Sequence, residues 1–220
     1  THPWLSLGVG LLYALGAGLA RYLGTSLDWP GFWSGLAWVI LVQLGGSLLL
    51  AYFDPHLAER LQELQARQRK AETLDRQSQD GMLPLDAFTL VRIQRAVLLA
   101  AFACLAVAGS VSILLAGAGR LNSSLLIWVL AGVIGVVIYS APPLRLATSG
   151  YGELLLAVLV SQVAPAVGFI LQEGEFHPLL STSTMPLVVL ALAMWIALDF
   201  PRFSSNTRLG IKTLVIRMGW

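Results

Sequence analysis

The sequence predicts an all-α membrane protein, built as a bundle of about six transmembrane helices. Two observations lead to this fold class. Of the 220 residues, 56% are hydrophobic and only 12% are charged, whereas a soluble domain carries about 25% charged residues. The chain also contains six mostly apolar stretches near the length of roughly 20 residues that a helix needs to cross a bilayer. We expect residues 1–220 to form a single transmembrane domain.

Each apolar stretch predicts one helix, because backbone groups in hydrocarbon must find their hydrogen-bond partners within the segment. In chain order the stretches are Trp4–Leu23, Trp33–Phe53, Ala96–Ala118, Leu125–Tyr139, Glu153–Leu171 and Pro186–Phe200. The fourth and sixth are short, and the uncharged residues 122–124 and 181–185 before them extend them. Glycines recur in the first and fourth stretches, as close helix packing in lipid favours.

The one long polar segment, residues 55–91, lies between the second and third stretches. Leu57, Leu61 and Leu64 recur there at helical spacing. This pattern predicts a surface helix over residues 57–75 and a loop over residues 76–86. For the loop, a solvated charged linker without regular structure is an equally good interpretation.

The basic residues predict the orientation. With six spans, one face receives twelve of them, and only Arg21 and Arg120 fall on the other face. The twelve are Arg60, Arg67, Arg69, Lys70, Arg76, Arg92, Arg95, Arg145, Arg202, Arg208, Lys212 and Arg217. The positive-inside rule then predicts a multi-pass protein of the inner or plasma membrane, with both termini and the 55–91 segment in the cytoplasm. The net charge of +2 gives no indication of nucleic-acid binding, and a lone cysteine, Cys104, excludes an intrachain disulfide.

Three polar clusters follow the even-numbered spans, at residues 47–59, 139–145 and 199–213, so the topology brings them to one membrane face. Asp54 and Asp199 are their most informative members. Both lie near a helix C-terminus, where the helix dipole disfavours an anion. Charged groups close to hydrocarbon are costly and are usually functional or paired. The alternative is that each aspartate marks the point where a helix meets water.

These clusters resemble the motifs of the UbiA superfamily, the intramembrane prenyltransferases that join polyprenyl chains to aromatic acceptors. The most similar branch is the one that prenylates dihydroxynaphthoate in menaquinone synthesis. Leu50–Asp54 matches the position of the family's NDxxD motif, and Tyr139–Leu146 reads like its YSAPPLRL segment. Asp199–Leu214 follows its second acidic motif, which resembles DFPDxxxDxxxGKxTL. The resemblance implies an incomplete version of the family's nine-helix barrel, closed by further helices or by a neighbouring subunit.

The departures from these motifs concern the metal. In the family, the two acidic motifs bind Mg²⁺, which holds the prenyl diphosphate. Here Leu50 and Ala51 replace the Asn and first Asp of the first motif, while Arg202 and Asn206 replace the later acids of the second. Hard divalent cations need several oxygen ligands, so we expect no cofactor. Arg202 is instead expected to pair with the surviving acid, Asp54.

We therefore expect a UbiA-like protein that has lost metal-dependent prenyl transfer. It would serve as an accessory or structural subunit of a membrane complex, with membrane lipids, other membrane subunits and an isoprenoid, quinone or pigment as its partners. The expected ligand-binding residues are Tyr139, Arg145, Arg202, Asn206, Arg208 and Lys212.

The alternative is an active, Mg²⁺-dependent prenyltransferase. Asp54 and Asp199 would then be catalytic, and Asp54 and Glu59 would bind the metal. A transporter is a third class, which the sequence supports little because few ionisable residues lie within the predicted spans.

Overall fold

The computed structural model describes residues 3–53, 87–203, 207 and 213–217, and these are helical apart from their connecting turns. Six spans are long and apolar enough to cross a membrane. Five of them are, wholly or for most of their length, the helices α1 (Pro3–Tyr22), α2 (Trp29–Tyr52), α4 (Ala87–Gly117), α5 (Ser123–Ser140) and α8 (Pro178–Asp199). The remaining span, Gly152–Glu173, joins α6 (Gly152–Val158), the π-helix η2 (Leu159–Val163) and α7 (Ala164–Glu173). The predicted all-α membrane bundle is thus confirmed.

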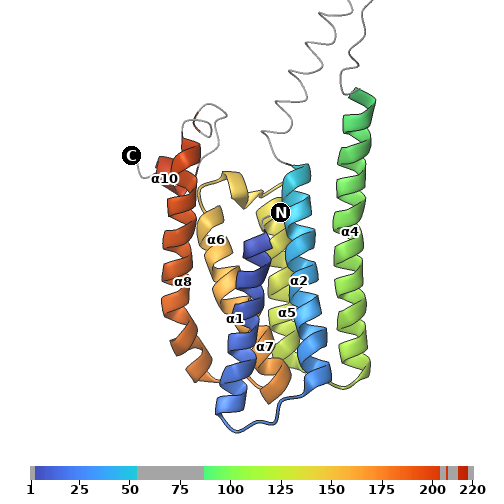
Figure 1. The fold of residues 1–220 in the computed structure, drawn as a ribbon, viewed down its shortest axis with the longest axis vertical. Coiled ribbons are helices and arrows are strands. Elements are labelled where there is room, and N and C mark those ends of the chain that lie inside the picture. The colour runs from blue at the N-terminus through green and yellow to red at the C-terminus, as the bar shows by residue number, and fades with distance from the viewer. Residues whose placement is uncertain (1–2, 54–86, 204–206, 208–212, 218–220) are drawn as a thin grey trace, which may run out of the picture.

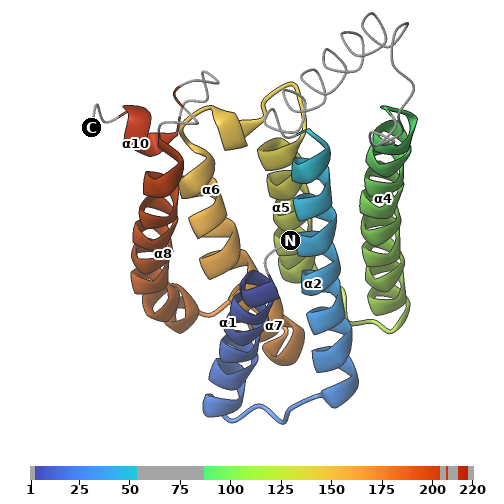
Figure 2. The same ribbon diagram turned by 45° about the horizontal axis from the view of Figure 1, so that its top comes forward.

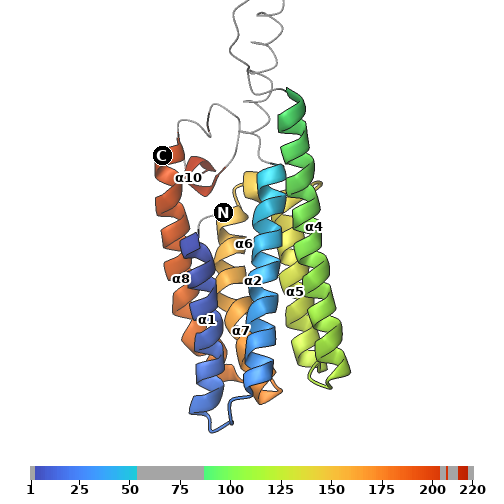
Figure 3. The same cartoon turned by 45° about the vertical axis from the view of Figure 1, so that its right-hand side comes forward.

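The spans run alternately down and up, which defines two ends of the bundle (Figure 1). At the upper end, α2, α5 and α8 finish and α4 and α6 begin. The short helices η1 (Leu146–Thr148), η3 (Phe200–Arg202) and α10 (Leu214–Arg217) lie there too. The lower end carries the α1–α2, α4–α5 and α7–α8 loops. In all three views α4 and α8 lie at opposite edges of the bundle (Figures 2 and 3).

The centre of the bundle is the Gly152–Glu173 span, of which 61% is buried, compared with 11% of the span in α4. Its α7 segment packs closely on α1. A Cβ atom on Gly16 would collide with the backbone carbonyl of Pro165, and one on Gly168 would collide with the carbonyl of Tyr13. Small residues at such crossings let membrane helices approach closely. The Tyr13 hydroxyl then donates to the Phe32 carbonyl at 2.8 Å, which ties α1 to α2.

Three predicted helix starts were wrong. The second span begins four residues before Trp33, because Asp28 caps α2 by accepting from the Gly31 amide at 3.2 Å and Pro30 fits the first turn. The helix that holds the third span begins at Ala87 rather than Ala96. The sixth span begins at Pro178, three residues before the predicted extension over residues 181–185, and Pro186 lies inside α8. A proline within a membrane helix is tolerated where neighbouring groups satisfy the freed backbone.

The predicted separation of basic residues holds for the described arginines. Arg145 and Arg217 lie at the upper end and Arg92 and Arg95 lie toward it on α4, whereas Arg21 and Arg120 lie at the lower end. The predicted surface helix over residues 57–75 and the loop over residues 76–86 fall outside the described residues.

Candidate functional site

The last turn of α5 positions the first predicted site residue, Tyr139, which is half-buried. The next residue, Ser140, is completely buried, and its hydroxyl donates to the Gly46 carbonyl at 3.1 Å. This bond fixes the end of α5 against α2. The chain then passes through Pro142 and Pro143, joined by a cis peptide bond, and turns back toward α6.

Arg145 occupies the middle of this turn in the left-handed region, at φ 39°. Three hydrogen bonds fix its backbone. Its amide donates to the Ala141 carbonyl at 3.1 Å, and its carbonyl accepts from the amide and hydroxyl of Thr148 at 3.1 and 3.2 Å. In contrast, the guanidinium Nε and Nη2 atoms are buried and have no hydrogen-bond partner within the described chain. Burying a charged group without a partner is costly, so this side chain is set up for an acceptor that these residues do not supply.

Glu153, in the first turn of α6, is a site residue that the sequence analysis missed. Its side chain is 8% exposed. One carboxylate oxygen, Oε1, accepts from the Leu214 amide at 3.3 Å, whereas Oε2 is buried with no partner among the described residues. The sequence held one signal for it: Glu153 is the only acid in the predicted fifth span. An acid is also favourable at a helix N-terminus, so this signal alone does not distinguish a site residue from a structural one.

Asp199 is the last polar group of this region. It is the last residue of α8, and the Tyr139 side chain interacts electrostatically with the carboxylates of both Glu153 and Asp199. Three helix ends, those of α5, α6 and α8, therefore bring these groups into one region. We refer to Tyr139, Arg145, Glu153 and Asp199 as the upper polar site.

The helix α10 packs beside this site, which the sequence did not indicate. Val215 is buried there, and the Arg217 guanidinium lies over the Tyr151 ring, 4.5 Å from its centre. Together with the Leu214–Glu153 hydrogen bond, these contacts hold α10 against the start of α6.

Most of the remaining predicted site residues lie outside the described part of the chain. This holds for Asp54, Glu59, Asn206, Arg208 and Lys212. Arg202 is placed by its backbone alone, in η3. The predicted Asp54–Arg202 pair and the Mg²⁺ ligands Asp54 and Glu59 therefore stay predictions. Among the residues that are described, no three His, Cys, Asp or Glu side chains group so as to hold a metal ion.

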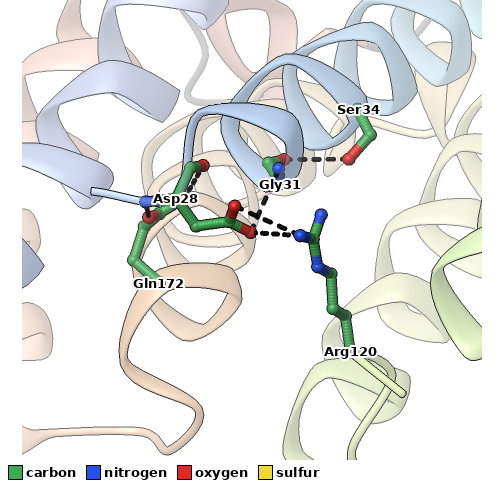
Figure 4. Close-up of polar contacts among 5 residues, drawn as sticks. All are labelled: Asp28, Gly31, Ser34, Arg120 and Gln172. Carbon is green, nitrogen blue, oxygen red and sulfur yellow. Dashed lines mark hydrogen bonds and ion pairs between the residues drawn. The ribbon is translucent and has the colours of Figure 1, made fainter. Parts of the chain in front are cut away.

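The lower end contains a polar network of a different kind (Figure 4). Asp28 forms an ion pair with Arg120 at 2.9 Å and accepts from the Gly31 amide. The Gln172 carboxamide accepts from the Asp28 amide at 2.7 Å and donates to the Asp28 carbonyl at 3.3 Å. Two further bonds, Thr25–Glu173 and Asn122–Gly174, join the same loops. These groups bind one another, so the network connects the three lower loops and is structural.

Comparison of the chain with protein-family models, with curated proteins and with solved structures found no match. The resemblance to the UbiA superfamily therefore rests on the three sequence motifs.

Proposed function

We propose that this chain is a UbiA-like membrane protein without prenyl-transfer activity, which binds the oxygen-bearing headgroup of an isoprenoid or quinone lipid at its upper polar site. It would do so as an accessory subunit of a membrane complex. The observation that carries the proposal is the partly buried Arg145, whose Nε and Nη2 atoms are buried and have no acceptor among the described residues.

The charge of Arg145 is the first argument. A guanidinium stays protonated in proteins, so it cannot escape burial by losing its proton. Arg145 forms no ion pair with any carboxylate of the described chain. Covering two nitrogens of a charged group without an acceptor is costly, and an incoming acceptor would remove that cost. The planar fork of an arginine suits two oxygen atoms of one group, such as a phosphate, a diphosphate or the oxygen-bearing edge of a ring.

The surroundings suit the tail of such a lipid. Leu144, Tyr151 and Phe200 are each more than half exposed, and all lie at the upper end. Exposed apolar side chains beside a polar site are typical of a surface that meets lipid or a ligand. A molecule with an oxygen-rich head and a prenyl tail matches this arrangement.

The accessory role is supported by the two edges of the bundle. Leu99 and Leu114 on α4, and Val189 and Leu190 on α8, are each at least 66% exposed. Lipid or the helices of other subunits would cover these apolar faces. Arg202 and Asn206, which replace acids in the family's second motif, make a metal-dependent ionisation step a poor fit.

The test uses the full chain in lipid nanodiscs, with farnesyl diphosphate as the probe. We expect saturable binding, a loss of at least tenfold in affinity for Arg145→Met, and no diphosphate release with or without Mg²⁺. Arg95→Met is the matched control, because Arg95 lies on the exposed surface of α4 and should leave binding unchanged. Absence of saturable binding, or equal affinity of Arg145→Met and wild type, would contradict the proposal.

The alternative is an active prenyltransferase. The interaction of Tyr139 with two carboxylates favours it, because acidic groups do remain at this end of the bundle. In this reading Asp54 and Glu59 would add metal ligands, and Arg145 would hold the diphosphate. Release of diphosphate that requires both Mg²⁺ and an aromatic acceptor would establish this function in place of the accessory role.

A further inference from the structure

The central span is interrupted halfway along its length. The π-helix η2 (Leu159–Val163) separates α6 from α7, and Pro165 is the second residue of α7. The neighbouring helix α8 contains Pro186. Single π-turns within α-helices are frequent at functional sites.

Polar side chains lie where these two interruptions meet. The Ser161 hydroxyl donates to the Leu187 carbonyl at 3.2 Å, and the completely buried Thr184 hydroxyl lies 2.9 Å from the Gln162 carboxamide oxygen. We call Ser161, Gln162 and Thr184 the midspan seam. It joins η2 to α8 within the apolar part of both spans, where polar groups are costly.

One end of the Gln162 carboxamide has no hydrogen-bond partner among the described residues. Its oxygen is bonded to Thr184, but its nitrogen, Nε2, is buried with no hydrogen-bond partner among the described residues. A carboxamide can both donate and accept, and which end faces Thr184 is set by the neighbouring hydrogen bonds. In either orientation one polar end is unpaired, so the seam holds one hydrogen-bonding group more than the described residues use.

We infer that the unpaired carboxamide nitrogen of Gln162 donates to a hydroxyl or carbonyl oxygen of a neutral, membrane-soluble molecule, such as a quinone ring or a prenol. The ligand is neutral because none of the three seam side chains carries a charge. It is distinct from a headgroup held by Arg145, since Gln162 lies nine residues beyond Glu153, about 13 Å along the axis at about 1.5 Å per residue. The inference therefore does not depend on the proposed headgroup site.

The ligand reaches the seam from the side of α8. This helix lies at the edge of the bundle (Figures 1 and 2), and its outer face carries the exposed side chains Val189 and Leu190. Because the Gln162 nitrogen is covered in this structure, an incoming oxygen must displace a neighbouring side chain or shift α8. Pro186 lies between Thr184 and Leu187, which both contact η2, and a proline is a position where a helix bends readily.

The experiment uses the full chain in nanodiscs with a photoreactive short-chain benzoquinone, and mass spectrometry identifies the labelled residues. We expect labelling on η2 and the middle of α8 that an excess of unlabelled quinone removes. Gln162→Met keeps the length of the side chain without its amide and should lower this labelling at least tenfold. Gln43→Met is the matched control, because Gln43 also has a buried, unpartnered amide atom, on α2, and should change nothing.

Three outcomes overturn the inference: labelling that does not saturate, labelling confined to the upper end, or equal labelling of Gln162→Met and wild type. If Gln162→Met does not fold, Gln162→Asn takes its place, because the shorter amide keeps the polarity but cannot span the same distance, and it too should lower labelling. Arg145→Met should leave the seam labelling intact. A failure of the headgroup site is therefore distinguishable from a failure of this one.

Discussion

The two ends of the bundle differ in whether their polar groups have hydrogen-bond partners. At the lower end, Asp28, Arg120 and Gln172 bind one another and the neighbouring backbone (Figure 4). At the upper end, Arg145 and Glu153 have buried polar atoms without partners in the described chain. Both ends close helix–helix connections, and both lie where a bilayer meets water. The difference is therefore not explained by position in the membrane.

The difference indicates that the polar groups of the lower end stabilise the fold, whereas those of the upper end bind a ligand. A buried polar group without a partner costs about 1–3 kcal/mol, so retaining two of them at one end needs a reason. A satisfied network stabilises the loops that it connects, whereas an unsatisfied one is able to bind something else. We therefore expect substitutions at the lower end to change stability and substitutions at the upper end to change ligand binding.

The largest effect is expected for Asp28→Ala. This change removes the N-cap of α2, which contributes about 1 kcal/mol, and the partly exposed ion pair with Arg120, which contributes up to about 1 kcal/mol. We expect the apparent free energy of unfolding in mixed micelles to fall by about 2 kcal/mol, with probe affinity unchanged. Asp28→Asn, which keeps a capping oxygen, should lose about half as much. A loss of binding free energy larger than the loss of unfolding free energy would contradict the proposal that the lower end serves stability and the upper end serves binding.

At the upper end, Arg145→Met should weaken ligand binding without lowering stability. Farnesyl diphosphate should bind at least tenfold more weakly, which corresponds to about 1.4 kcal/mol. The stability of the ligand-free protein should stay the same or rise by about 1 kcal/mol, because an unpaired buried charge is removed. Calorimetric titration and thermal unfolding of the same nanodisc preparation measure the two quantities. A clear loss of stability with unchanged binding would assign Arg145 a structural role.

The sequence predicted the fold well because the dominant interaction is local in the chain. Each apolar stretch forms its backbone hydrogen bonds within its own helix. The number of spans and the all-α class therefore follow from the composition and length of the stretches. The errors arose at polar or proline-containing boundaries. The predicted second span left out residues 29–32, whereas Asp28 and Pro30 together start α2 at Trp29. The sixth span, extended back to residue 181, still began three residues after the true start of α8 at Pro178.

The site residues that the sequence predicted, Tyr139, Arg145 and Asp199, all belong to short polar motifs at span ends. Tyr139 and Arg145 belong to one short motif, and the structure places both at the upper end. Glu153 was missed because its partner, the Leu214 amide, is 61 residues away in the chain, and no periodicity links the two. The lower network was missed for the same reason: Gln172 lies 144 residues from Asp28, and Arg120 lies 92 residues from it. Long-range polar pairs leave no pattern in a single sequence.

A smaller effect is expected for Arg120→Met, which repeats the chemistry of Arg145→Met at the other end. Its ion pair with Asp28 is partly exposed, so its loss should cost about 0.5–1 kcal/mol of stability and leave probe binding unchanged. The measured loss should shrink as salt is raised, since salt screens exposed charges. If both arginine variants shift stability in the same direction, the proposed difference between the ends is wrong.

The smallest effect is expected for Glu153→Gln. This variant distinguishes an anionic headgroup from a ring that carries a hydroxyl group. The carboxamide oxygen still accepts from the Leu214 amide, so stability should change by less than about 0.5 kcal/mol, as is usual away from disrupted contacts. For an anionic headgroup near Arg145, removing the negative charge of Glu153 should raise affinity about twofold, or about 0.4 kcal/mol. If the affinity for diphosphate is unchanged and a hydroxylated ring compound binds more weakly to the variant, then Glu153 accepts a hydrogen bond from the headgroup. The upper polar site would then favour a ring with a hydroxyl group over a diphosphate.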